Sequence, residues 1–171
     1  MAVLPIVIYP DPRLRQVSQP VEAITDNIRR LVDDMKETMY ATQGAGLASI
    51  QIGKPIRLFL LDGMLIDNDS KADAIVLVNP EIISYEGSEE GDEGCLSFPG
   101  IFVPITRATR CTVRATNLDN ESVEFTGEGI VSRAIQHETD HLNGRLIIDH
   151  VGKLKRKLID RRMRKAEAKT H

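Results

Sequence analysis

Apolar side chains recur at helical spacing in three parts of the chain. Residues 28–39 follow a helical period behind Thr25 or Asp26, either of which suits the cap of a helix. The spacing becomes helical again from about Glu128, and once more in the last 21 residues. The pattern predicts an N-terminal helix, a second helix in the last third of the chain, and a C-terminal helix over about residues 151–168.

The middle of the chain consists of short β-branched or aliphatic runs that are typical of strands. These runs are residues 56–61, 74–78, 81–85, 111–116 and 122–125, and a strand-like piece follows the second helix at 146–148. Asn79-Pro80 and Asp119-Asn120 are turn signals, and such close connections favour antiparallel pairing. The acidic segment Gly87–Asp92 has the composition of a flexible, solvated loop. We expect an α+β fold in which antiparallel sheets pack around the second helix.

The composition is that of one globular domain. The 171 residues fall within the usual size of a domain, and no linker or repeat divides them, so we expect residues 1–171 to form a single domain. The apolar segment Ala2–Tyr9 is interrupted by proline and lacks a basic lead-in, so it predicts neither a signal peptide nor a membrane span. We therefore expect a cytoplasmic protein with no membrane and no DNA among its partners.

Charge is distributed unevenly along the chain. The last 21 residues hold nine Lys or Arg against Asp160 and Glu167, a net of +7. Because the whole chain carries −3, residues 1–150 carry −10. A basic segment suits the phosphate backbone of RNA, but charge alone is not specific, and a solvated helix has the same composition. Both interpretations of the C-terminal helix stay open.

The sharpest chemical signal lies on the second predicted helix, where His137 and His141 are four residues apart with Glu138 between them. One helical turn brings both imidazoles to the same face, so they can reach one transition metal. Glu138 stands beside them, placed to take a proton from water. Apolar residues continue the same helical rows, so the polar cluster should face the interior, where burial without a partner costs several kcal/mol.

A hydrolytic metal site needs a third protein ligand, and Cys95 is the best source. The chain has two cysteines, too few for a disulfide framework, so each thiol needs its own explanation. Cys111 lies in a strand pattern and suits a small buried side chain. Cys95 lies between a glycine-containing acidic stretch and an apolar run, where a turn could deliver its thiolate to the site.

Three other classes of protein share parts of this pattern. A zinc endopeptidase would use the same base, but its third ligand usually follows the motif, where Asp149 and His150 are the nearest candidates. A thiol hydrolase would use Cys95 as nucleophile and His137 as base. A metal-stabilised peptide-binding module would keep the ligands and tolerate the loss of Glu138.

Three segments, in this order, resemble the signature motifs of peptide deformylases. They are residues 44–51 (GAGLASIQ), 93–97 (EGCLS) and 136–141 (QHETDH). Residues 9–15 and 77–80 are also similar to that family, so the resemblance covers nearly the whole chain. It implies a metal-dependent hydrolase that removes the formyl group from the N-terminal formyl-methionine of newly synthesised polypeptides and releases formate.

The resemblance also implies roles for individual residues. The metal ligands would be Cys95, His137 and His141. The general acid/base would be Glu138, and Gln51 with the backbone N–H of Leu96 would stabilise the oxyanion. The N-formylated nascent peptide would lie along Gly44, Ala45, Gly46, Gly94 and Ala134. Glu93 and Arg107 match positions that brace the metal loop, although a weak solvated pair would have the same sequence.

The same resemblance also gives expectations about the bound metal, the partner of the C-terminal helix and the width of the substrate pocket. It implies one divalent metal per chain, with ferrous iron as the native ion and zinc, nickel or cobalt able to replace it, because one thiolate and two imidazoles suit all of them. In some relatives a C-terminal helix docks on the ribosome, which gives the basic tail a specific partner. Ala45 is smaller than the aliphatic residue usual there, which predicts a wider methionine pocket. Arg133 is either a charge at the pocket mouth or a solvated helix residue.

Overall fold

The computed structural model describes residues 2–66 and 73–170, and it contains three α-helices and seven strands in this part of the chain. The helices are α1 (Asp26–Ala41), α2 (Ile130–Leu142) and α3 (Lys153–Thr170). The strands are β1 (Gly46–Ala48), β2 (Leu58–Leu61), β3 (Ile75–Glu86), β4 (Glu89–Cys95), β5 (Phe98–Arg107), β6 (Arg110–Thr116) and β7 (Ser122–Glu128). The predicted α+β class with antiparallel sheets is confirmed.

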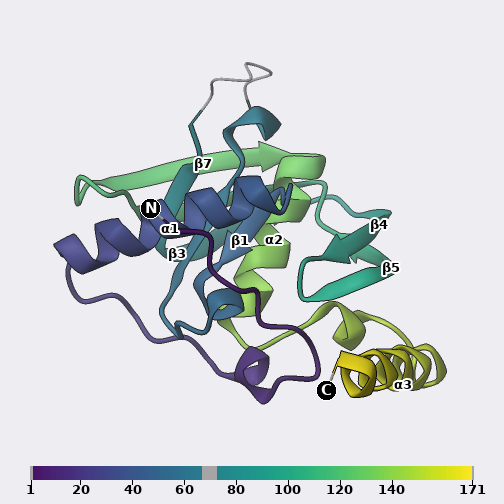
Figure 1. The fold of residues 1–171 in the computed structure, drawn as a ribbon. Coiled ribbons are helices and arrows are strands. Elements are labelled where there is room, and N and C mark those ends of the chain that lie inside the picture. Colours follow the sequence, from purple (N-terminus) through teal and green to yellow (C-terminus); the bar gives the residue numbers. More distant parts are fainter. Residues whose placement is uncertain (1, 67–72, 171) are drawn as a thin grey trace.

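The strands form two antiparallel sheets on either side of α2 (Figure 1). Five strands make the large sheet in the order β1-β2-β3-β6-β7, and β4 pairs with β5 as a separate hairpin. Helix α2 contacts β7, β1 and β2 of the large sheet and β5 of the hairpin. The helix that carries the two histidines therefore lies in the middle of the molecule, as the sequence predicted.

Strand β2 explains how the large sheet is held between two helices. Its side chains alternate between the faces, as the period of a strand requires. Phe59 and Leu61 pack in the cluster that contains the apolar side of α2, whereas Leu58 and Leu60 pack with Val32, Met35 and Met39 of α1. All four β2 side chains are fully buried. Thr25 caps α1, since its hydroxyl accepts a hydrogen bond from the backbone N–H of Ile28.

A third apolar cluster joins the N-terminal segment, the hairpin and α3. Ile159 and Met163 are the buried side chains that α3 contributes to it, and most other α3 side chains are exposed. The Tyr9 hydroxyl donates a hydrogen bond to Asp160 of the same helix. Helix α3 thus lies at the edge of the molecule (Figure 1), and its basic side chains are mostly exposed. None of the helices among the described residues has the length and apolar character needed to cross a membrane.

One sequence prediction about the large sheet was wrong. Asn79-Pro80 is not a turn between two strands but an irregularity inside β3, where the register shifts between Val78 and Glu81. Asn79 has a φ of 50°, and its side chain bonds the backbone N–H and C=O of Val21. A bulge admits both the left-handed asparagine and a proline without an N–H, so the strand continues past them.

The acidic segment and the piece after α2 also differ from prediction. Residues 89–92, predicted as loop, begin strand β4, which pairs along its whole length with β5. Glycine and acidic residues have a low preference for strands, so the composition did not indicate a strand that pairing with β5 stabilises. Residues 146–148 are not a strand but lead into a single 3-10 turn, Ile147–His150, in which all three apolar side chains are buried against the hairpin and α3. The apolar run reflects burial rather than sheet pairing.

Candidate metal centre

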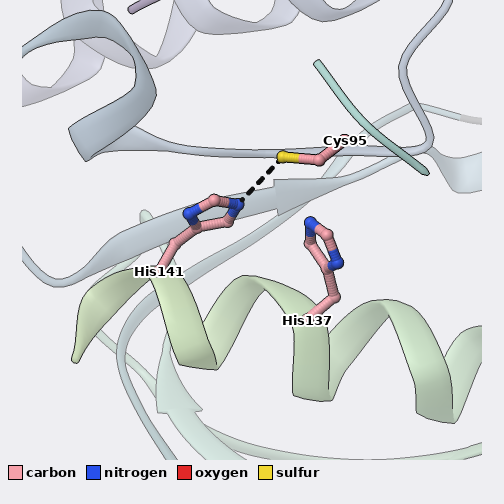
Figure 2. A group of neighbouring side chains, drawn as sticks. All are labelled: Cys95, His137 and His141. Carbon is pink, nitrogen blue, oxygen red and sulfur yellow. Dashed lines mark hydrogen bonds between the residues drawn. The ribbon is translucent and has the colours of Figure 1, made fainter. Parts of the chain in front are cut away.

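Two elements bring three metal-ligating side chains together. His137 and His141 lie one turn apart on α2, and Cys95 ends strand β4. The ligand atoms of the three residues all lie within 4.8 Å of one another, and Cys95 Sγ is 3.4 Å from His141 Nε2. Figure 2 shows both rings projecting from the helix toward the sulfur. The structure thus brings together the three residues that the sequence nominated as ligands.

The chemistry of these donors fits one transition-metal cation. One sulfur and two imidazole nitrogens are the usual donors of a mononuclear zinc or iron site, and three protein ligands leave a position open for water or substrate. His137 Nδ1 lies 2.8 Å from Glu93 Oε1, so Nε2 is the nitrogen left for a cation. A carboxylate on the far nitrogen is the arrangement that orients a ligating histidine.

Glu138 lies beside the cluster in a buried position. Its side chain is 2% exposed, and its Oε2 has no hydrogen-bond partner among the described residues. Burial raises the pKa of Glu138 to about 7, against the opposing effect of His137. A carboxyl group with a pKa near neutrality can both accept and donate a proton, which is the property a general acid/base needs.

The pKa values of the two histidines are shifted in opposite directions. Burial opposes protonation of His137, but hydrogen bonding with Cys95 and Glu93 outweighs it and raises its pKa well above the ordinary value. Burial and the neighbouring His137 hold the pKa of His141 well below that value. The Nδ1 atom of His141 has no hydrogen-bond partner among the described residues. Metal ligation requires neutral imidazoles, so a bound cation would compete with the proton on His137.

Glu93 connects the cluster to a buried ion pair. Arg107 donates from Nε and from one terminal nitrogen to the two Glu93 oxygens, at 2.8 and 2.9 Å. Both side chains are almost fully buried, at 5% and 6% exposure, so the predicted brace is not a weak solvated pair. Burial opposes ionisation of Glu93, yet the hydrogen bonds from Arg107 and His137 outweigh it and hold its pKa far below the ordinary range. Arg107 also donates to Asp140, which in turn contacts His150.

Gln51 reaches the cluster from the turn that follows β1. Its Oε1 accepts a hydrogen bond from the Ala48 backbone, and its Nε2 lies 3.1 Å from Ser97 Oγ and 3.6 Å from Cys95 Sγ. The amide is fixed at both ends and 1% exposed. Sequence reasoning did not assign Ser97, although it follows Cys95 within the same motif, which was the available signal.

A cleft of about 590 Å³ opens beside the cluster. All five predicted substrate-binding residues line it, together with Gln51, Leu96, Glu138 and His137. Gly94 has a steric reason to be glycine, because a Cβ at this position would lie 2.7 Å from the Phe102 ring. Phe102 and Ile130 also line the cleft, although they are 70% and 64% exposed. The sequence did not nominate either, because neither residue is part of a motif.

The alternative ligands and the second thiol lie elsewhere. Asp149 pairs with Arg15, and His150 pairs with Asp140, so neither completes the cluster as a zinc endopeptidase would require. Cys111 is 1% exposed, and its sulfur lies 3.8 Å from the Ser132 carbonyl oxygen. It packs as the small buried side chain expected of a cysteine in a strand.

A family model described as "Polypeptide deformylase" matches residues 3–157. The chain belongs to the polypeptide deformylase family. The resemblance seen in the sequence is confirmed, and the chain is an enzyme of the deformylase class. The match includes the cluster and the cleft, and it ends before most of α3.

Individual deformylases match over nearly their full length. The peptide deformylase of Acidobacterium capsulatum is 49% identical over 167 residues, which cover 98% of this chain and 97% of that protein. The one from Alkalilimnicola ehrlichii is 46% identical, covering 96% and 91%. The crystal structure of a Legionella pneumophila deformylase has a TM-score of 0.90 at 41% identity, covering 99% and 98%. An Ehrlichia chaffeensis deformylase, solved in complex with actinonin, has the same TM-score at 36% identity, covering 98% and 99%.

Proposed function

We propose that this chain removes the N-formyl group from the N-terminal formyl-methionine of newly synthesised polypeptides by metal-dependent hydrolysis, releasing formate. Family membership supports the deformylase reaction. The observation that carries the metal dependence is the convergence of Cys95, His137 and His141 within 4.8 Å, beside a buried Glu138. Nascent chains arise where ribosomes work, so we propose the cytoplasm as the compartment.

Each catalytic residue has a role that its position supports. A divalent cation held by Cys95, His137 and His141 would supply Lewis acidity, which activates water and polarises the formyl carbonyl. Glu138 takes a proton from the attacking water and passes it to the leaving amine, as a carboxyl with a pKa of about 7 can do. Gln51 Nε2 and the Leu96 backbone N–H donate hydrogen bonds to the formyl oxygen as it becomes negative.

The peptide binds along the cleft in an extended conformation. Gly44, Ala45 and Gly46 lead into and begin the edge strand β1, and Gly94 of β4 lines the same cleft. Backbone groups of an edge strand can pair with an added peptide strand. Ala45 and Ala134 are small side chains in the lining, and we propose that they leave space for the first side chain of the substrate.

We propose one divalent metal per chain, with ferrous iron as the native ion and with zinc, nickel and cobalt able to replace it. The one-sulfur, two-nitrogen donor set is compatible with all four ions. Iron beside a thiolate is sensitive to oxygen, through oxidation of either partner. The iron form should therefore lose activity in air, whereas the nickel or zinc form should keep its activity. Stable aerobic turnover of the iron form would contradict this assignment.

We also propose that α3 contacts ribosomal RNA. Its basic side chains are mostly exposed, whereas Ile159 and Met163 tie the opposite side to the core. An exposed basic helix of this kind suits a phosphate backbone.

The direct test is an anaerobic assay with formyl-Met-Ala combined with a count of bound metal. We expect formate release in proportion to bound metal up to one ion per chain, and loss of activity on chelation. Activity that survives complete removal of metal would favour a thiol hydrolase with Cys95 as nucleophile. Metal binding without formate release would favour a peptide-binding module.

A further inference from the structure

Arg133 is held in a way that the proposed reaction does not explain. It projects from α2, one turn before His137, and it lines the cleft with 16% of its side chain exposed. Arg133 therefore does line the pocket, as one interpretation of the sequence expected, but its guanidinium is held by four acceptors and is not that of a solvated helix residue. Among the described residues, its side-chain hydrogen bonds all run to the β4–β5 hairpin.

The guanidinium gathers three backbone carbonyls and one carboxylate. One terminal nitrogen donates to Glu93 Oε2 and the Ile105 carbonyl, both at 2.8 Å, and lies 3.3 Å from the Gly91 carbonyl oxygen. The other donates to the Glu89 carbonyl at 2.9 Å. The planar fork of an arginine suits several acceptors at once in a way that a lysine ammonium does not.

Gly91 is shaped to this arginine. A Cβ added at Gly91 would lie 3.2 Å from both the central carbon and a terminal nitrogen of the Arg133 guanidinium. This is tighter than most real contacts of a Cβ atom, so a larger side chain would push the guanidinium from its acceptors. The glycine in the middle of β4 and the arginine on α2 therefore form one fitted contact.

These contacts join the two elements that carry the ligands. Cys95 ends β4, while His137 and His141 lie on α2, and Glu93 is hydrogen-bonded to both Arg133 and His137. Arg107 cannot replace this link by itself, because it belongs to the hairpin and reaches α2 through Asp140, beyond His137. We infer that Arg133 is a positioning residue that fixes the Cys95 strand against the histidine helix and so preorganises the metal site.

This inference rests on the proposed metal centre, and its test measures metal affinity rather than turnover. Arg133→Met keeps an unbranched stem of about the arginine's length up to Nε and removes the guanidinium donors. We expect the zinc affinity, measured by competition with a chromophoric chelator at a temperature where all variants are folded, to fall by about 10-fold or more, the usual effect of losing a partner that orients ligands. Arg114→Met is the matched control, since Arg114 is exposed, pairs with Glu124 across strands β6 and β7, and is not among the residues that line the cleft.

Two further variants separate positioning from a general loss of stability. Arg133→Lys should recover only part of the affinity, because one ammonium cannot serve all four acceptors. Gly91→Val should lower affinity by displacing the guanidinium, and combined with Arg133→Met it should add little, because both changes remove the same contact. Cobalt-loaded Arg133→Met should also show altered visible absorption bands, since these report ligand geometry.

The outcomes are distinct. Zinc affinity of Arg133→Met within twofold of the unmodified chain would overturn the inference and leave the proposed function intact. Additive losses in the Gly91→Val, Arg133→Met double variant would also overturn it, because the two residues would then act separately. An unmodified chain that binds no zinc would overturn the proposed metal centre and the inference with it.

Discussion

Glu138 Oε1 lies 4.0 Å from His137 Nε2, with the carboxyl group buried and its other oxygen without a hydrogen-bond partner among the described residues. A side chain in this position would be a poor structural choice, because burying an unsatisfied carboxyl costs free energy. Its place beside the ligand cluster gives it a chemical purpose. Proton exchange during the reaction would explain why the chain has a carboxyl here in spite of the free energy that its burial costs.

The first prediction follows from this position. Glu138→Gln keeps the size of the side chain and removes the proton exchange, so kcat for formyl-Met-Ala should fall by at least about 100-fold. Metal content per chain should stay unchanged, because Glu138 is not among the ligand atoms that converge. A near-normal kcat of the Glu138→Gln enzyme would exclude Glu138 as the acid/base. Glu121→Gln, in the connection between β6 and β7, provides a control for the substitution itself.

A second prediction concerns the pocket for the first residue of the substrate. Ala45 lines the cleft, and replacing it with isoleucine fills space there. We expect Ala45→Ile to lower kcat/KM for formyl-Phe-Ala by about 10-fold relative to formyl-Met-Ala, since a change of a few methylenes in a pocket has effects of this size. Ala168→Ile, on the exposed part of α3, should leave the ratio of the two substrates unchanged. Strong rejection of formyl-Phe-Ala by the unmodified chain would contradict the hypothesis that Ala45 widens the pocket.

The basic tail offers a third prediction, and the structure decides which variant to use. Deleting α3 would remove Ile159 and Met163 from an apolar cluster, so a deletion would confound binding with folding. Lys155 and Lys157 are exposed, and changing both to Glu leaves the core intact. We expect weaker co-sedimentation with ribosomes at low salt and a shallower dependence on salt concentration, with unchanged turnover of formyl-Met-Ala.

A control with the same charge change elsewhere makes this result specific. Lys54 and Arg30 are exposed and lie outside α3, so the Lys54→Glu, Arg30→Glu variant has the same net charge as the tail variant. It should sediment with ribosomes like the unmodified chain. Equal weakening in both double variants would show that net charge, rather than α3, governs the association.

The fourth prediction links stability to pH through Asp149. Burial opposes its ionisation, but hydrogen bonds from Arg15 and from the Leu146 backbone outweigh burial and hold its pKa below the ordinary value. A carboxyl with a lowered pKa in the folded state contributes stability above its unfolded pKa of about 3.9, and this contribution is lost as the pH falls through the folded pKa.

Asp149→Asn should therefore lower the free energy of unfolding by about 1 kcal/mol at pH 7, allowing for the partial exposure of Arg15. The difference between the two proteins should shrink as the pH falls below 4, as measured by denaturant unfolding at several pH values. Asp33→Asn, on the exposed side of α1, should change stability little across the same range. A constant difference at all pH values would contradict the linkage.

Residues close together in sequence were the easiest part to predict. The spacing of His137 and His141 specifies one helical face, so their convergence follows from the helix alone. Of the two cysteines, Cys95 was the better candidate for the third metal ligand. The core helices were visible for the same reason, since a period of 3.6 is a local property. Resemblance supplied the proposed roles that spacing does not specify, such as the one proposed for Gln51.

Contacts between residues far apart in the sequence were not predictable in this way. Strand β5 alternates buried Val103, Ile105 and Arg107 with exposed residues, a pattern present in the sequence, but two prolines and a glycine within the strand obscure it. Strand β4 exists because β5 pairs with it, which no local preference of acidic residues and glycine indicates. The destination of Arg133 depended on that pairing, so its role emerged only with the hairpin in place.

The central claim is that one sulfur and two imidazoles hold a single cation, and X-ray absorption on the zinc-loaded chain tests it most directly. The account predicts one sulfur at about 2.3 Å and two imidazole nitrogens at about 2.0–2.1 Å, with the sulfur lost in Cys95→Ser and retained in Cys111→Ser. A spectrum with no sulfur neighbour in the unmodified chain, or one unchanged by Cys95→Ser, would contradict it.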